Sequence, residues 1–120
     1  SISVGGGIST YRGLVRVTAK APNSSVAVNC DALLIDDASV SNTYPTMKID
    51  QANVDMAHEA TVGKIGDEEI FYLRSRGLSE DQARQMVVAG FIEPIVKALP
   101  LEYAIELNKL IELEMEGSVG

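Results

Sequence analysis

Apolar and polar residues alternate along the first half of the chain, which is the pattern of β-strands with one buried face. The runs 14–19 (LVRVTA) and 26–30 (VAVNC) alternate in this way. A third run has a mostly polar side and a side that contains Ala52, Val54, Met56, His58, Ala60 and Val62. Turn-forming residues fill the gaps at 21–25, 36–39 and 42–45. No helical pattern interrupts these runs, so residues 1–62 are predicted to form a sandwich, a barrel or the rungs of a β-solenoid.

The pattern becomes helical after Gly66. Three acids at 67–69 precede apolar residues and a stop at Gly77, and Ser79 and Gln82 have the spacing of a capping box. Helical spacing continues over 83–90, and a third, shorter helix is expected over 92–99, closed by Pro100. A fourth is expected from Leu101 to just before Gly117. The second half is therefore predicted to be a compact subdomain of four short helices.

The charge differs between the two halves. The whole chain has a net charge of -7. Residues 1–66 carry six acidic and five basic side chains, a net of −1, whereas residues 67–120 carry eleven and five, a net of −6. Such asymmetry indicates two regions with different roles. The acidic balance lacks the basic footprint of nucleic-acid-binding domains, and no apolar run reaches membrane-spanning length. We therefore expect neither nucleic acid nor membrane as a partner.

The N-terminal residues and the cysteine count give two further expectations. The start, Ser1 to Val4, has neither an initiator Met nor the pattern of a signal peptide, and it reads as the middle of a domain. The single cysteine excludes an internal disulfide framework and fits a reducing compartment, so a cytoplasmic location is expected.

Three features are candidates for a binding site, and the first two are the run Gly5–Gly7 and Cys30. The run Gly5–Gly7 lacks the following Lys-Ser/Thr pair and helix of a phosphate loop, so a bend or a tight rung is expected instead. Cys30 shares its side of the strand with Val26 and Val28. It is either a small buried hydrophobe or a functional thiol, and a metal or cluster role would need further ligands from elsewhere in the chain or from another chain.

His58 and Glu59 form the third candidate. Neighbours on a strand point to opposite faces, so the two share a ligand set only if the strand bends or bulges. A hydrogen-bonded core histidine is the alternative. A Cys30–His58 nucleophilic pair would require adjacent strands. The helical half adds carboxylates that are either a solvated face or part of an amphipathic docking surface: Glu102, Glu106, Glu112, Glu114 and Glu116.

Several phrases taken together resemble one protein family. They are 8–15 (ISTYRGLV), 29–35 (NCDALLI), 58–65 (HEATVGKI) with its continuation through 71–79 (FYLRSRGLS), and 99–103 (LPLEY). Over essentially its whole length the chain resembles the C-terminal portion of SufB in the SufB/SufD family, the scaffold proteins of the SUF iron–sulfur cluster assembly system. The cysteine in its Asn-Cys-Asp setting favours SufB over the sister subunit SufD.

The resemblance implies an architecture for both halves. Residues 1–62 would be the last rungs of a right-handed parallel β-helix, and residues 63–120 a C-terminal helical domain, which gives a mainly β plus α fold. Each rung of such a solenoid is buried only by its neighbours, so terminal rungs alone should be poorly stable. We therefore expect more β-helix to precede Ser1 in the complete protein.

The resemblance also implies a function. The family is a non-enzymatic scaffold on which an iron–sulfur cluster is assembled transiently, with Cys30 at the nascent-cluster site and His58 and Glu59 as further cluster- or metal-binding candidates. Some relatives carry an additional acid before the histidine, where this chain has Ala57. The implied partners are the SufC ATPase, docked on residues 63–120, SufD or a second SufB, and a sulfur-donor protein. The alternatives are a SufD-like structural subunit or docking module without a cluster and, less favoured, a thiol enzyme that uses Cys30 and His58.

Overall fold

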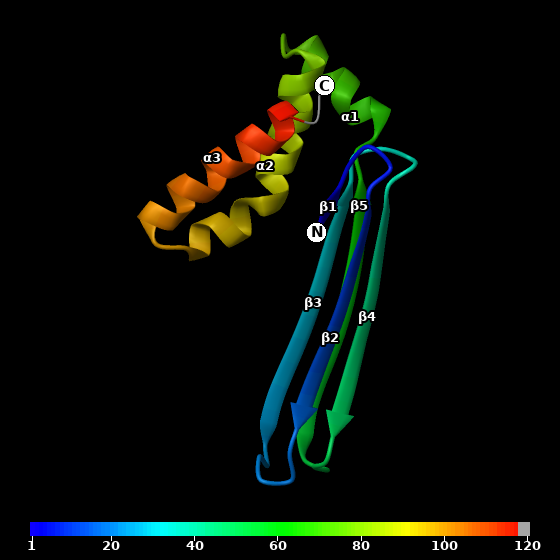
Figure 1. Cartoon of the computed structure of the whole chain (residues 1–120), viewed down its shortest axis with the longest axis vertical. Coiled ribbons are helices and arrows are strands. Elements are labelled where there is room, and N and C mark those ends of the chain that lie inside the picture. Colours follow the sequence, from blue (N-terminus) through cyan, green and yellow to red (C-terminus); the bar gives the residue numbers. More distant parts are fainter. Residues whose placement is uncertain (118–120) are drawn as a thin grey trace. The chain divides into compact units, whose positions relative to one another are not determined.

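The computed structural model describes residues 1–117, with side chains to Met115, and divides into a strand unit and a helical unit (Figure 1). The strand unit comprises Ser1–Gly63, and the helical unit begins at Lys64. Residues 118–120 of the predicted helical domain lie outside the described part. The strands are β1 (Ile2–Ser3), β2 (Ile8–Val17), β3 (Ser24–Leu34), β4 (Val40–Ile49) and β5 (Val54–Lys64).

Successive strands alternate between two sheets. One sheet has the order β1-β3-β5 and the other the order β2-β4. Within each sheet the strands run parallel, with Ile8 opposite Val40 and Val17 opposite Ile49 in β2 and β4, and Ile2 opposite Leu33 in β1 and β3. The prediction of parallel strands without intervening helices in the first half is thus confirmed.

Side chains alternate between the inside of the strand unit and its surface, as a period of two requires. In β3 the even-numbered side chains from Val26 to Cys30 are half-buried and their odd-numbered neighbours are exposed. The best-buried apolar residues of the unit lie toward the strand ends: Val17, Ala32, Leu33 and Ile35. In β2, by contrast, Ile8 and Leu14 face outward and are 71% and 62% exposed.

The glycine run forms a turn, as the sequence predicts. Gly5 and Gly6 have φ angles of 64° and 76°, a conformation that is costly for residues with a Cβ atom. The Gly5 amide donates a 2.6 Å hydrogen bond to Oδ2 of Asp36, and the amides of Ala38 and Ser39 donate to Oδ1. The Asp36 carboxylate therefore ties the 5–7 turn to the turn that follows β3.

The largest error of the sequence prediction is at β4. Residues 42–45 (NTYP) were expected to form a turn, yet they lie in the middle of that ten-residue strand. The Val40 amide donates to the carbonyl of Gly7, just before β2, and the Asp50 amide, just after β4, donates to the carbonyl of Val17 at the end of β2, so even-numbered amides of β4 point toward β2. The backbone nitrogen of Pro45 faces the other edge, where its missing N–H interrupts no bond to β2.

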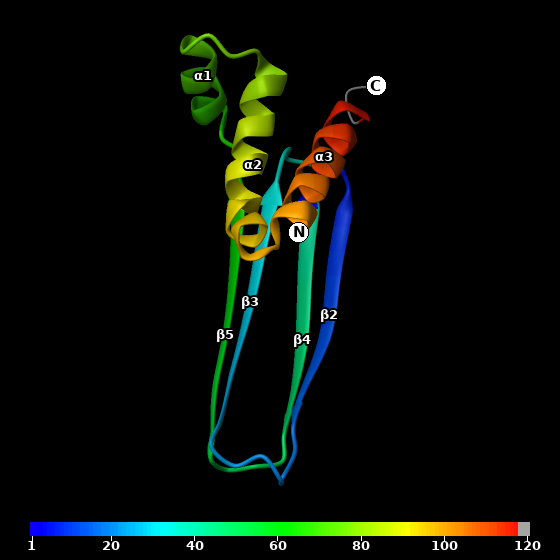
Figure 2. The same ribbon diagram turned by 90° about the vertical axis from the view of Figure 1, so that its left-hand side faces the viewer.

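The described part of the helical unit contains three helices rather than the predicted four. They are α1 (Asp67–Ser75), α2 (Glu80–Ala98) and α3 (Leu101–Gly117), and the expected third helix over 92–99 is the continuation of α2. Pro94 removes one hydrogen-bond donor inside α2. The helix continues because Val88 and Ile92, on one face and on either side of Gly90, are both buried. α3 packs along α2 (Figure 2).

The start of α2 agrees with the sequence prediction. The Gln82 amide donates to Oγ of Ser79 at 3.2 Å, and the Ser79 amide donates to Oε1 of Gln82 at 2.9 Å, which completes the capping box. Among the described residues, no helix has the length and hydrophobicity needed to cross a membrane.

Candidate functional site

Cys30 lies on the inward face of β3. It is a free thiol of intermediate exposure, in line with Val26 and Val28. The strand places it there because the residues from Val26 onward alternate strictly, with Asn29 and Asp31 on the exposed side. Neither predicted alternative for Cys30 is decided by its position, since a half-buried thiol is both packed and reachable.

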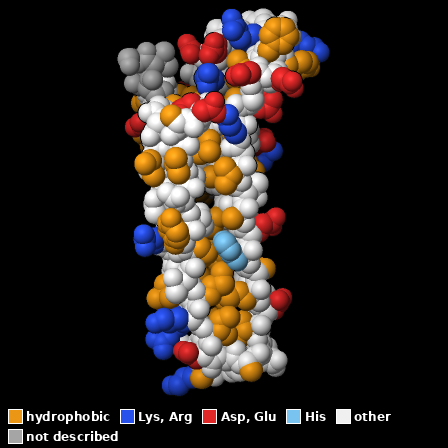
Figure 3. All heavy atoms as spheres, turned by 90° about the vertical axis from the view of Figure 1, so that its right-hand side faces the viewer, with side chains coloured by type: hydrophobic (Ala, Val, Ile, Leu, Met, Phe, Trp, Pro, Cys, Tyr) orange, Lys and Arg blue, Asp and Glu red, His pale blue; other side chains and the backbone are white. Residues whose placement is uncertain are grey.

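His58 and Glu59 lie in β5, the neighbour of β3 in the three-stranded sheet. Both side chains are exposed, so His58 is not the buried core histidine of the alternative reading. Val54 and Met56, which precede His58 on the same parity, are half-buried, whereas Val62 is 60% exposed. In Figure 3 the chain's single histidine lies at the surface with hydrophobic side chains above and below it.

The relation of Cys30 to His58 follows from contacts at the two ends of β3 and β5. At one end the Asn23 amide donates a 2.9 Å hydrogen bond to the carbonyl of Asn53. At the other, a Cβ atom on Gly63 would lie 3.8 Å from the carbonyl oxygen of Ala32. Both contacts join residues about 30 positions apart, so His58 lies beside residues 27–28 of β3. Cys30 is two to three residues farther along, or roughly 7–10 Å at the rise of a strand.

These three residues do not form a complete metal site within one chain. Among the described residues, no group of three or more His, Cys, Asp or Glu side chains is arranged to hold a metal ion. Glu59 is adjacent to His58 in an extended strand, which directs the two side chains to opposite faces. The geometry therefore offers one thiol and one imidazole on neighbouring strands. Both are good ligands for iron, and the thiolate can also accept sulfur.

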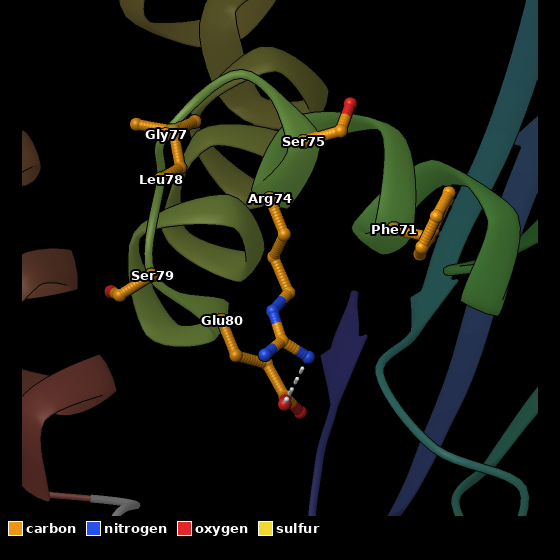
Figure 4. A pocket seen from close by; sticks show the side chains of 7 residues that line it. All are labelled: Phe71, Arg74, Ser75, Gly77, Leu78, Ser79 and Glu80. Carbon is orange, nitrogen blue, oxygen red and sulfur yellow. Dashed lines mark ion pairs between the residues drawn. The ribbon is translucent and has the colours of Figure 1, made fainter.

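A cavity that the sequence reasoning missed lies at the corner between α1 and α2. It has a volume of about 620 Å³ and is lined by Phe71, Arg74, Ser75, Gly77, Leu78, Ser79 and Glu80. Figure 4 shows Arg74 extended toward Glu80, and their charged groups are 3.6 Å apart. The sequence signals were the helix stop at Gly77, which has a φ of 98°, and the cap at Ser79. They located the corner but not the hollow beside it.

The outer side of α3 combines apolar and acidic side chains. Tyr103, Leu110 and Leu113 are each more than half exposed. The acidic positions 102, 106, 112 and 114 are exposed as well, while the side chain of Glu116 lies outside the described ones. A groove of about 530 Å³ between α2 and α3 is lined in part by Met86, Ile92 and Met115. Apolar surface of this extent with an acidic rim is typical of a protein interface.

Comparisons with known proteins identify the family. The family model "SUF system FeS cluster assembly, SufBD core domain" matches residues 1–91. The chain is 58% identical over 120 residues to an iron–sulfur cluster assembly SufBD family protein of Mycobacterium tuberculosis, and equally identical to one of Mycobacterium leprae. It is 50% identical over 120 residues to the iron–sulfur cluster assembly protein SufB of Bacillus subtilis. Each match covers the whole of this chain. The chain spans only 14% of the length of each mycobacterial protein and 26% of the length of the Bacillus protein. The chain therefore belongs to the SufBD family of the SUF iron–sulfur cluster assembly system.

Proposed function

We propose that this chain is the C-terminal part of a SufB-type scaffold on which an iron–sulfur cluster is assembled. In this proposal the strand unit provides the nascent-cluster site and the helical unit docks the SufC ATPase. The protein is a non-enzymatic, cytoplasmic scaffold, and the cluster is its transient cargo. The observation that carries the proposal is the placement of Cys30 and His58 on neighbouring parallel strands of a SufBD core domain.

The site is incomplete in one chain, and this supports an interface. One thiol and one imidazole leave a cluster short of ligands, since iron–sulfur clusters are commonly held by four. Val62, four residues beyond His58 on the same side of β5, is 60% exposed and suited to burial against another protein. We infer that SufD or a second SufB covers this face and supplies the remaining ligands. Glu59 joins them only if the partner reaches the opposite face of β5.

The strand order supports the β-helix expected from the family. Alternation of successive strands between two parallel sheets is how a solenoid is built, with each strand stacking on the one two positions earlier. In this arrangement β1 and β2, β3 and β4, and finally β5 belong to successive rungs. Cys30 lies one rung before His58, which places both near the last rung.

Anaerobic reconstitution tests the cluster proposal. The full-length protein with its SUF partners is incubated with ferrous iron and sulfide, and the visible charge-transfer absorbance is measured. Cys30→Ala should lose most of that absorbance. Val28→Ala removes a side chain of the same strand face and serves as the matched control, which should retain it. Equal absorbance in wild type and Cys30→Ala would refute a cluster role for the thiol.

A SufD-like subunit that holds no cluster is the second candidate function. It is favoured by the lack of a three-ligand group among the described residues. In the same experiment it predicts a colourless wild-type complex that still binds the ATPase. Pull-down of SufC tests the docking proposal separately from the cluster proposal. Deletion of residues 64–120 should abolish capture of SufC, whereas Cys30→Ala should leave capture unchanged.

A further inference from the structure

The outer face of the β2–β4 sheet has a chemistry of its own. The register places Ile8 beside Val40, Arg12 beside Tyr44, Leu14 beside Thr46 and Arg16 beside Lys48, all at outward positions. In the proposed solenoid the outward face of a parallel sheet is open to solvent, yet this face carries exposed apolar side chains. Ile8, Leu14 and Tyr44 are 71%, 62% and 52% exposed.

The charge on this face is basic although the whole chain is acidic. The strands β2 and β4 contain three basic residues, Arg12, Arg16 and Lys48, and no Asp or Glu. The strands β3 and β5 show the opposite balance, with Asp31, Asp55 and Glu59 against Lys64. Figure 3 shows Lys and Arg side chains along one edge of the strand unit, where an acidic side chain also lies among them, and Asp and Glu side chains along the other edge. Such separation gives the unit one positive and one negative face.

Two interactions hold the basic side chains on this face. The Arg12 guanidinium lies over the Tyr44 ring, 5.0 Å from its centroid, so charge and aromatic surface form one patch. Arg16 forms a 3.4 Å ion pair with Asp50, which follows β4. Arg and Tyr are the residue types enriched at interface hot spots, because they combine apolar contact area with polar groups.

We propose that this surface, defined by Ile8, Arg12, Leu14, Tyr44 and Lys48, docks an acidic protein surface with an apolar centre. Charge complementarity identifies the partner. The positive face attracts acidic groups, whereas the net charge of -7 of the whole chain repels them, so the partner's acidic groups must be confined to a local patch. A long polyanion such as duplex DNA would also meet the acidic remainder of the chain. Exposed leucine and isoleucine between the charges need an apolar counterpart, which a nucleic acid backbone does not offer. The interaction is separate from the Cys30 site and from the helical unit.

A binding measurement tests the proposal. The full-length protein is titrated into a fluorescent peptide in which Glu alternates with Leu and Tyr, and anisotropy is recorded at two salt concentrations. Lys48→Glu and Arg12→Glu should each weaken binding at least tenfold, and the affinity of the wild type should fall as salt rises. Lys109→Glu, which reverses the charge of an exposed lysine on α3, is the matched control and should change the affinity for the peptide by less than twofold.

Competing probes complete the test. Poly-glutamate, duplex DNA and vesicles that contain phosphatidylserine are measured in the same way. The proposal requires that the mixed acidic and apolar peptide binds more tightly than all three. It is overturned if any of them binds as tightly, if the peptide does not bind, or if Lys109→Glu weakens binding as much as Lys48→Glu. Circular dichroism of each variant shows whether a loss reflects misfolding, and Arg12→Lys, which keeps the charge, should then retain part of the affinity.

Discussion

The strand unit and the helical unit are stabilised in different ways. β2 pairs with β4 across 32 positions of sequence, from Ile8 to Val40, so the strand unit depends on contacts between distant residues. In the helical unit, local contacts three or four residues apart define the start of α2, as at Ser79 and Gln82 or Glu80 and Arg84. Local contacts can be recognised from a short stretch of sequence, whereas pairing between strands cannot. In the proposed function, the strand unit holds the ligands and the helical unit provides the docking surface.

The largest expected effect is a break of the helical unit alone. Val88 is 1% exposed, so Val88→Asp buries a carboxylate among apolar side chains and should destabilise the unit by about 3 kcal/mol or more. Ala89→Asp is the matched control, because Ala89 is exposed on the same helix. Thermal unfolding followed by circular dichroism should show a large loss of stability for Val88→Asp and a small loss for Ala89→Asp. Similar losses in both would contradict the packing of α2 described here.

A pair of glycine substitutions should act in opposite directions in the two units. A Cβ atom at Gly7 would lie 2.9 Å from the Val4 carbonyl oxygen, so Gly7→Ala forces the backbone to shift and should cost about 1–2 kcal/mol. A Cβ atom at Gly90 would have no other group within 4 Å, and Gly90→Ala should stabilise α2 by about 0.5–1 kcal/mol. Denaturant titration of both variants measures the difference. A stabilising Gly7→Ala would show that the turn is looser than the structure has it.

How far the sequence predicted the structure also depended on this distinction. The capping box at Ser79 and the glycine turn at 5–7 were predicted correctly, because each depends on a few neighbouring residues. β4 was missed, since NTYP resembles a turn when it is read locally and becomes a strand through its pairing with β2. The predicted break between residues 90 and 92 was wrong, because Val88 and Ile92 are both buried on one face of the continuous helix α2.

The sequence predicted which residues belong to the candidate site but not how they lie relative to one another. Family phrases singled out Cys30, His58 and Glu59, and alternation placed Cys30 in line with Val26 and Val28. The sequence could not supply the relation between β3 and β5, which depends on the contacts of Asn23 and Gly63 at the strand ends. The basic outer face was also hidden, because Arg12 and Tyr44 become neighbours only through the register.

The smallest expected effect is a pH dependence confined to the strand unit. Desolvation raises the pKa of Asp36, but hydrogen bonds from Ser39, Gly5 and Ala38 outweigh it and hold that pKa below its ordinary value of 3.8. A carboxyl with a lowered pKa in the folded state stabilises the fold above its unfolded pKa, and this contribution is lost as the pH falls through the folded value. Asp36→Asn should therefore flatten the dependence of stability on pH below about 4. An unchanged acid transition in the variant would contradict this role.

The proposed function puts a thiol of the strand unit at an interface and an ATPase on the helical unit, and we further propose that this ATPase controls access to the thiol. The most direct measurement is a maleimide-labelling time course of Cys30 in the complete SUF complex, with the site read by peptide mass analysis. The account predicts slow labelling at rest and faster labelling during ATP turnover, because movement of the subunits opens the interface. Equal rates with and without ATP, or full reactivity at rest, would contradict it.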